Sequence, residues 1–177
     1  MKSKLISISA ISSAFVAIAL TIGVYFDMAD LFCLVVASVF VTLPLYYKSY
    51  LASFLSYLVG GVIAFIFSGF NFLIVTIPAY LLFFGIFPLV KNFMEEKNVN
   101  KYVRYIIGLV WCVLAVYGMF FFYKNVMNLD FSDLPAFISD NILIVVGILS
   151  VIFYFVYERF LTAFRIFINQ FLSKVLK

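Results

Sequence analysis

The chain has 177 residues, of which 67% are hydrophobic and 11% are charged. Polar residues are too few to cover a water-soluble globule of this size, so we expect lipid to face most of the surface. The formal net charge of +4 comes from basic residues scattered over short segments between apolar runs, which argues against a nucleic-acid partner.

Runs without Asp, Glu, Lys or Arg predict the membrane spans. They cover residues 5–26, 31–47, 49–90, 105–123 and 141–157. A bilayer core of roughly 30 Å takes about 20 helical residues, so the run 49–90 must fold back once. Gly69 and Asn71 mark the best turn within it. The sequence therefore predicts one all-α domain, 1–177, a polytopic membrane protein with six transmembrane helices. The predicted spans are 5–26, 30–47, 50–68, 70–90, 102–124 and 139–158.

The basic residues fall almost entirely on one side of the membrane once these spans are drawn. Of the 12 Lys and Arg residues, only Lys124 lies on the other side. Loops rich in Lys and Arg stay on the cytoplasmic side of a membrane. We therefore expect a multi-pass protein of the cell membrane whose N and C termini are both cytoplasmic.

The residues after Tyr157 form two different sides at helical spacing. The apolar side holds Phe160, Phe164, Phe167 and Phe171. The polar stripe holds Glu158, Thr162, Arg165, Asn169 and Ser173. This pattern predicts an amphipathic helix over 159–176 that lies along the inner membrane surface. The alternative is a sixth span that simply projects into the cytoplasm.

Residues that would carry catalysis or bind a metal are missing from the predicted spans. The chain has no histidine, which removes the commonest general base and metal ligand. It also has no Gly-rich loop ending in Gly-Lys-Ser or Gly-Lys-Thr for ATP hydrolysis. The acidic pair Glu95 and Glu96 falls in a predicted charged link from Lys91 to Lys101. We expect no enzyme activity, no cofactor, no metal site and spans with uncharged interiors.

A few polar side chains lie deeper in the predicted spans or cap them from outside, and these are the candidate substrate-binding residues. Each needs a hydrogen-bond partner in hydrocarbon, which is either another helix or a ligand. Pro78 removes one backbone hydrogen bond near Ile74 and predicts a kink that would widen a pocket. The candidates are Asp27, Asn71, Thr76, Tyr80, Trp111, Tyr117 and Asn141.

Small residues line the cytoplasmic half of the first predicted span, namely Ala10, Ala14 and Ala17. Ala10 and Ala14 form a small-x-x-x-small pair, which lets two helices approach closely. Such a pair serves either packing within the bundle or docking of a separate subunit.

Residues 10–69 contain three motifs: Ala-Ile-Ser-Ser-Ala at 10–14, Leu-Pro-Leu at 43–45, and the small residues of 49–69, which include Gly60 and Gly61. With these motifs, the segment resembles the first half of S components, the substrate-binding membrane subunits of energy-coupling factor (ECF) transporters. Six spans without an ATPase motif are also typical of that family.

The resemblance implies a role in ATP-driven uptake. In that family, a pair matching Ala10 and Ala14 meets the coupling helices of a shared energy-coupling transmembrane subunit. Two cytoplasmic ATPase subunits supply the energy through that subunit. The resemblance also implies a vitamin-like small molecule held near the outer face, which is released inward when the S component topples in the lipid bilayer.

Two other functions fit the residues. One is a non-transporting membrane structural or assembly protein, which would have no ligand cavity. The other is a small ion-coupled carrier that uses Asp27 or Asp30 at the outer ends of the spans.

Overall fold

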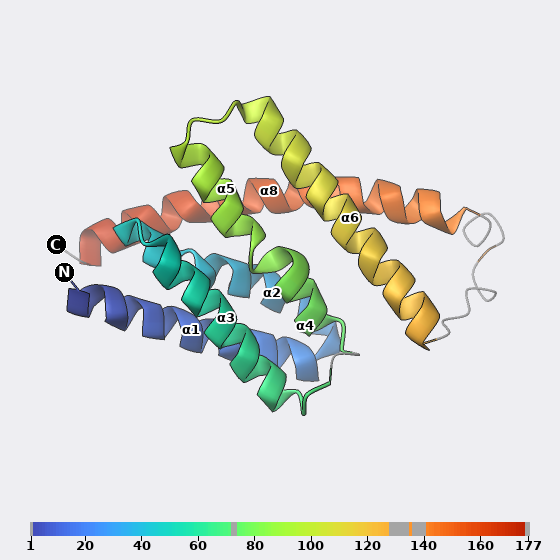
Figure 1. Ribbon diagram of the computed structural model, residues 1–177, viewed down its shortest axis with the longest axis horizontal. Helices are drawn as coiled ribbons and strands as arrows, with labels where there is room; N and C mark the ends of the chain where they lie inside the picture. The colour runs from blue at the N-terminus through green and yellow to red at the C-terminus, as the bar shows by residue number, and fades with distance from the viewer. Residues whose placement is uncertain (1, 72–73, 128–134, 136–140, 176–177) are drawn as a thin grey trace.

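The structure is a computed structural model that describes residues 2–71, 74–127, 135 and 141–175 (Figure 1). It does not describe the side chains of residues 2, 27, 127, 168–169 and 171–175. All regular secondary structure of the described residues is helical, without a strand. Its elements are α1 (Lys2–Tyr25), η1 (Asp27–Ala29), α2 (Asp30–Val41), η2 (Leu43–Tyr47), α3 (Tyr50–Phe67), α4 (Thr76–Ala79), η3 (Tyr80–Phe84), α5 (Phe87–Glu96), α6 (Lys101–Met127) and α8 (Ile142–Val175).

Six helical segments of the described chain are long and apolar enough to cross a membrane, as predicted. They are Ser3–Tyr25, Asp30–Tyr47, Tyr50–Phe67, Thr76–Glu96, Lys101–Val126 and Ile142–Phe167. Five of the six agree with the predicted spans to within a few residues at their starts, because the apolar runs there begin after charged or turn residues. The protein is therefore a multi-pass membrane protein.

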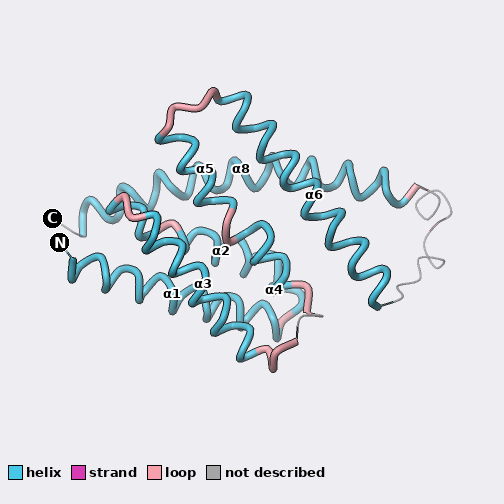
Figure 2. The backbone as a smooth tube through the Cα atoms, in the orientation of Figure 1, coloured by secondary structure: helices cyan, strands magenta, loops and turns pink. Residues whose placement is uncertain are grey.

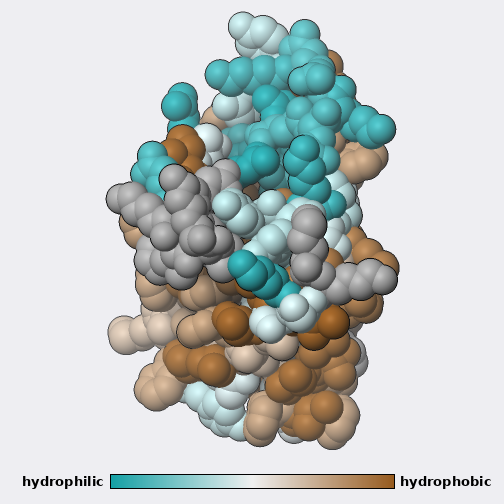
Figure 3. Space-filling model, turned by 90° about the vertical axis from the view of Figure 1, so that its left-hand side faces the viewer, coloured by the Kyte–Doolittle hydropathy of each residue, from teal (hydrophilic) through white to brown (hydrophobic). Residues whose placement is uncertain are grey.

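Both termini lie at the left of Figure 1 and the connection between α5 and α6 at its upper left, so that all three are on one side of the bundle. We call this end the basic end, because Lys48, Lys97, Lys101 and Arg104 lie at the helix ends found there. Figure 3 looks at this end, where hydrophilic side chains cover the upper part and hydrophobic ones the lower part. The opposite end holds the C-terminus of α1 and the C-terminus of α6.

The fourth span forms the centre of the bundle. In its most apolar stretch 67% of the residues are buried, against 11% for Lys101–Val126. α1 packs against α2 and α3 on one side, and α6 packs against α8 on the other. The buried core runs between these groups and includes Leu20, Ile77, Tyr80 and Phe87. Side chains of the fourth span therefore make up much of the buried interior of the protein.

The predicted bounds of this fourth span, 70–90, are wrong. The turn forms where expected, with Gly69 at a φ of 71°, which is a conformation that glycine adopts without strain. The helix starts only at Thr76, however, and continues to Glu96. Lys91, Glu95 and Glu96 are consequently helical and do not lie in a link between spans.

Pro78 does not cause the kink that the sequence predicts. It lies in the first turn of α4, where a backbone N–H has no carbonyl partner within the helix, so the missing N–H of proline breaks no helical hydrogen bond. The carbonyl of Ile74 accepts a hydrogen bond from the Ile77 N–H at 3.3 Å. The break in the central span comes later, at the π-helical residues of η3 and the turn at Gly85–Ile86, which Figure 2 shows as a short non-helical stretch.

α8 runs from Ile142 to Val175 without interruption. Its 34 residues have a length of about 51 Å, which exceeds the hydrocarbon thickness of roughly 30 Å. Within the described residues, no break separates 142–158 from 159–175. The placement of its last turns on a membrane surface stays a prediction.

Candidate functional site

The break in the central span frees backbone carbonyls inside the bundle, and side chains of the neighbouring helices bind them. The Gly85 N–H donates to the Tyr80 carbonyl at 2.8 Å, which closes the π-helical turn. The Tyr57 hydroxyl of α3 donates to the Leu81 carbonyl at 3.0 Å. The Trp111 indole N–H of α6 donates to the Leu82 carbonyl at 2.9 Å. An unpaired carbonyl in hydrocarbon is costly, so these two bonds stabilise the break.

Three predicted substrate-binding residues thus use their polar groups to join helices. Trp111 binds the Leu82 carbonyl. Tyr80 is fully buried and donates to the Tyr57 carbonyl at 3.2 Å. Tyr117 donates from α6 to the Leu143 carbonyl of α8 at 2.6 Å. Of the two kinds of partner expected for these polar groups, another helix or a ligand, the structure shows backbone carbonyls of the protein itself.

The other predicted binding residues lie apart from one another. Thr76 is buried at the start of α4, where its methyl group lies beside Gly23 of α1. Asn71 and Asn141 are exposed near the opposite end, in the chain before α4 and before α8. The side chain of Asp27 is outside the described residues. The structure does not bring the predicted set together around one cavity.

A wide, open hollow of about 490 Å³ lies near the opposite end of the bundle, and we call it the Asp30 cavity. Four helical regions line it, namely η1 with the start of α2, the α4–η3 segment, α6 and α8. The lining side chains include Met28, Asp30, Leu31, Leu34, Val75, Ala79, Phe84, Val116, Met119, Val146, Leu149, Ser150 and Phe153. Its volume is in the range of small-molecule sites.

The lining of the Asp30 cavity is apolar and aromatic, with a single charge. Asp30 is the one ionisable residue among the described lining residues. Phe84 and Phe153 form an edge-to-face pair with ring centroids 5.7 Å apart. The Ser150 hydroxyl donates to the Gly147 carbonyl at 2.8 Å, so its oxygen can still accept a hydrogen bond. Asp30 is not among the substrate-binding residues predicted from the sequence. Its position as the first residue of α2, at the end of an apolar run, is the feature that could have indicated it.

A larger hollow, about 630 Å³, lies between Leu82 and the exposed side of α6. Apart from Trp111, its lining is aliphatic, and includes Ile106, Val110 and Leu114. The Trp111 N–H already donates to the Leu82 carbonyl. The described lining of this groove therefore offers a ligand no free polar group for recognition.

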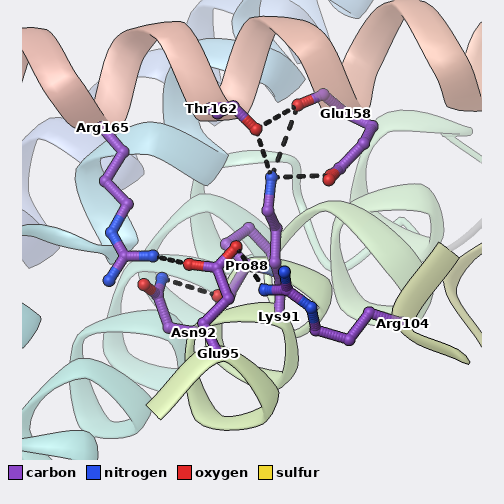
Figure 4. A network of polar contacts seen from close by, with 8 residues as sticks. All are labelled: Pro88, Lys91, Asn92, Glu95, Arg104, Glu158, Thr162 and Arg165. Carbon is purple, nitrogen blue, oxygen red and sulfur yellow. Dashed lines mark hydrogen bonds and ion pairs between the residues drawn. The ribbon is translucent and has the colours of Figure 1, made fainter. Parts of the chain in front are cut away.

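Charged side chains join three helices at the basic end (Figure 4). Lys91 of α5 forms an ion pair with Glu158 of α8 at 2.7 Å and donates to the Thr162 hydroxyl at 2.8 Å. Glu95 of α5 binds Arg104 of α6 at 2.8 Å and also binds Arg165 of α8. We call these residues the charged clasp: Lys91, Glu95, Arg104, Glu158 and Arg165.

The charged clasp corrects the prediction that the span interiors are uncharged. The side chains of Lys91 and Glu158 are only 8% and 11% exposed, so the interiors of the spans are not all uncharged. Glu158, Thr162 and Arg165 of the polar stripe contact α5, while Thr162 is exposed and the Arg165 side chain is 38% exposed. These residues recur at intervals of four and three along α8, which places them on one helix face.

Ala10 and Ala14 are exposed on α1, whereas Ala17 is buried in the core. Contacts within the bundle use other positions of α1. The Ser12 hydroxyl donates to the Phe40 carbonyl at 2.7 Å, and the Ser56 hydroxyl of α3 donates to the Ser9 carbonyl at 3.1 Å. The surface around Ala10 and Ala14 is therefore not covered by the described helices.

No protein-family model matches this sequence, no curated protein matches it, and no solved structure matches its fold.

Proposed function

We propose that this chain is a substrate-binding membrane subunit similar to the S components of ECF transporters. It would capture a vitamin-like small molecule in the Asp30 cavity at the outer face. A separate energising module, with a coupling transmembrane subunit and two ATPases, would drive its uptake.

The exposed pair Ala10 and Ala14 carries this proposal. A small-x-x-x-small pair allows close approach of a second helix. Helix contacts within this bundle are made through Ser9, Ser12 and other positions of α1, so the pair remains available to a helix of another subunit. The Asp30 cavity at the other end of the bundle supports the proposal, because a non-transporting structural protein needs no such cavity.

Docking can be tested by co-expressing the chain with a tagged energising module and purifying through the tag. Ala10→Leu with Ala14→Leu is expected to reduce retention of the chain by about tenfold or more, since two leucines hold the helices apart and a tenfold change is about 1.4 kcal/mol. Ala163→Leu is the matched control, because Ala163 is an exposed alanine of α8. Failure to retain the wild type, or equal retention of the double variant, would show that the docking proposal is wrong.

The lining of the Asp30 cavity favours a ligand with an aromatic or aliphatic body and one positively charged or hydrogen-donating group. Asp30 would bind that group, and Phe84 and Phe153 would contact the body. A styrylpyridinium dye and its uncharged styrylpyridine parent are suitable probes, since they share a shape and differ in charge. Wild type is expected to bind the cation about tenfold more tightly than the neutral parent.

Asp30→Asn is expected to remove this preference while leaving binding of the neutral parent unchanged, and dye fluorescence in a fixed detergent measures both affinities. Asp30→Glu, which keeps the charge, is the control. Equal binding of the two probes by wild type would show that Asp30 does not select the ligand. That outcome would leave the docking test unaffected.

An ion-coupled carrier is the second candidate, and the buried Lys91–Glu158 pair favours it, because ionisable groups within spans often serve ion transport. Reconstitution of the purified chain alone in proteoliposomes distinguishes an ion-coupled carrier from a substrate-binding subunit that needs an energising module. Uptake without any energising module would support the carrier, and its loss in the double variant Lys91→Met with Glu158→Leu, which removes both charges and leaves neither partner buried alone, would assign it to this pair.

A further inference from the structure

A second pocket lies at the basic end and is separate from the Asp30 cavity. It has a volume of about 290 Å³, and we call it the Arg165 pocket. Thr42 and Tyr46 at the η2 turn, Lys48 after it, Asn92 and Glu96 of α5, and Arg165 of α8 contribute to its lining. The pocket thus contains charges of both signs.

Asn92 provides an unused hydrogen-bond acceptor in this pocket. The residue is only 5% exposed. Its side-chain N–H₂ donates to the Pro88 carbonyl at 2.9 Å, and its Oδ1 has no hydrogen-bond partner. The opposite orientation of the amide would place two oxygens against each other, so the orientation is fixed. A buried acceptor of this kind is satisfied by an ordered water or by a donor from a bound molecule.

The cationic side of the pocket has incomplete charge compensation. Glu95 is shared between the guanidinium groups of Arg104 and Arg165. Lys48 is exposed and forms no ion pair with any residue that the structure describes. Arg165 and Lys48 are therefore suited to an anionic oxygen group such as phosphate. Glu96 and Asn92 are suited to a cationic donor.

The pocket lies at the level where membrane spans end. The second span ends at Tyr47, the third begins at Tyr50, and the fourth ends at Glu96. Residues at such positions meet the lipid headgroups, and basic pockets between transmembrane helices bind headgroup phosphates. Tyr46, half-exposed at the rim, is a residue type enriched at this level.

We infer that the Arg165 pocket binds the headgroup of a phospholipid that carries both a phosphate and an ammonium with N–H groups. Lys48 and Arg165 bind the phosphate. Asn92 Oδ1 and the Glu96 carboxylate accept hydrogen bonds from the ammonium. This site does not depend on the function proposed above.

Native mass spectrometry of the full chain in detergent, with three lipids of identical acyl chains, tests the inference. Phosphatidylethanolamine has the phosphate and the N–H donors, phosphatidylcholine has the phosphate without such donors, and diacylglycerol has neither. We expect phosphatidylethanolamine to bind roughly tenfold more tightly than phosphatidylcholine, and diacylglycerol to bind most weakly. Equal binding of the three lipids, or no bound lipid, would overturn the inference and leave water as the occupant.

Two variants divide the site into its two halves. Lys48→Gln is expected to weaken both phospholipids about fivefold, whereas Lys97→Gln, at an exposed lysine of the same end that does not line the pocket, leaves them unchanged. Asn92→Leu is expected to bring phosphatidylethanolamine down to the level of phosphatidylcholine. Because Lys48 is exposed, its substitution leaves a folded protein even where Asn92→Leu does not. Equal effects of Lys48→Gln and Lys97→Gln would contradict a specific site.

Soluble phosphoethanolamine distinguishes a lipid from a soluble ligand with the same chemistry. Excess phosphoethanolamine is expected to leave bound phosphatidylethanolamine in place, because the acyl chains contribute to binding. Displacement at equal concentrations would overturn the assignment to a lipid.

Discussion

Lys91→Met is expected to lower the free energy of unfolding by about 3–5 kcal/mol, the usual cost of removing one partner of a buried ion pair. The substitution keeps the apolar length of the side chain and removes its charge. Glu158, 11% exposed and paired with Lys91 at 2.7 Å, is then left buried without a cation. The bond from Lys91 to the Thr162 hydroxyl is lost as well. Denaturation in mixed detergent micelles, followed by the fluorescence of Trp111, measures the change.

The double variant Lys91→Met with Glu158→Leu is expected to recover most of that loss, because replacing both members of a buried ion pair by apolar residues is often neutral or stabilising. Lys97→Met is the control, since Lys97 is exposed at the end of the same span and surface charges contribute about 0–1 kcal/mol. A single variant as stable as wild type, or a double variant no more stable than the single one, would mean that the pair is not buried as described.

The charged clasp also explains where sequence reasoning fails. Hydropathy treats Lys91 as the end of a span, because an unpaired ammonium in hydrocarbon is costly. In the structure, its partner is Glu158, 67 residues further along the chain. The spacing of Lys91 and Glu95, and that of Glu158, Thr162 and Arg165, already places each set on one helix face. Only the tertiary fold turns those two faces toward each other.

Features with a local cause were predictable from the sequence. The turn at Gly69 was predicted from residue type, and it forms with a positive φ. The start of the second span at Asp30 and that of the third at Tyr50 follow from the charged residues nearby. The polar candidates Tyr80, Trp111 and Tyr117 were recognised as needing partners, but their carbonyl partners lie on other helices or at the helix break. The Asp30 cavity is formed by four separate regions of the chain, so no short pattern marks it.

Gly85→Ala is the second large effect that we expect, a loss of about 1–3 kcal/mol in the free energy of unfolding from overpacking. A Cβ at this position would overlap two ring atoms of Tyr57 and lie 2.9 Å from the Tyr80 ring. Neither ring is free to withdraw. The Tyr57 hydroxyl binds the Leu81 carbonyl, and the Tyr80 hydroxyl binds the Tyr57 carbonyl. The added methyl group therefore displaces Tyr57 from the helix break, which leaves the Leu81 carbonyl unpaired in the interior.

Gly118→Ala is the matched control, because nothing lies within 4 Å of a Cβ built there. Gly118 lies inside α6, where alanine is the better helix former, so we expect no loss and a gain of up to about 1 kcal/mol. The chain has one tryptophan, and its indole N–H binds the Leu82 carbonyl at the same break. Its emission is therefore expected to shift in Gly85→Ala and to stay unchanged in Gly118→Ala. If both variants were equally stable and their emission matched that of wild type, the break would not depend on the close contact between Gly85 and Tyr57.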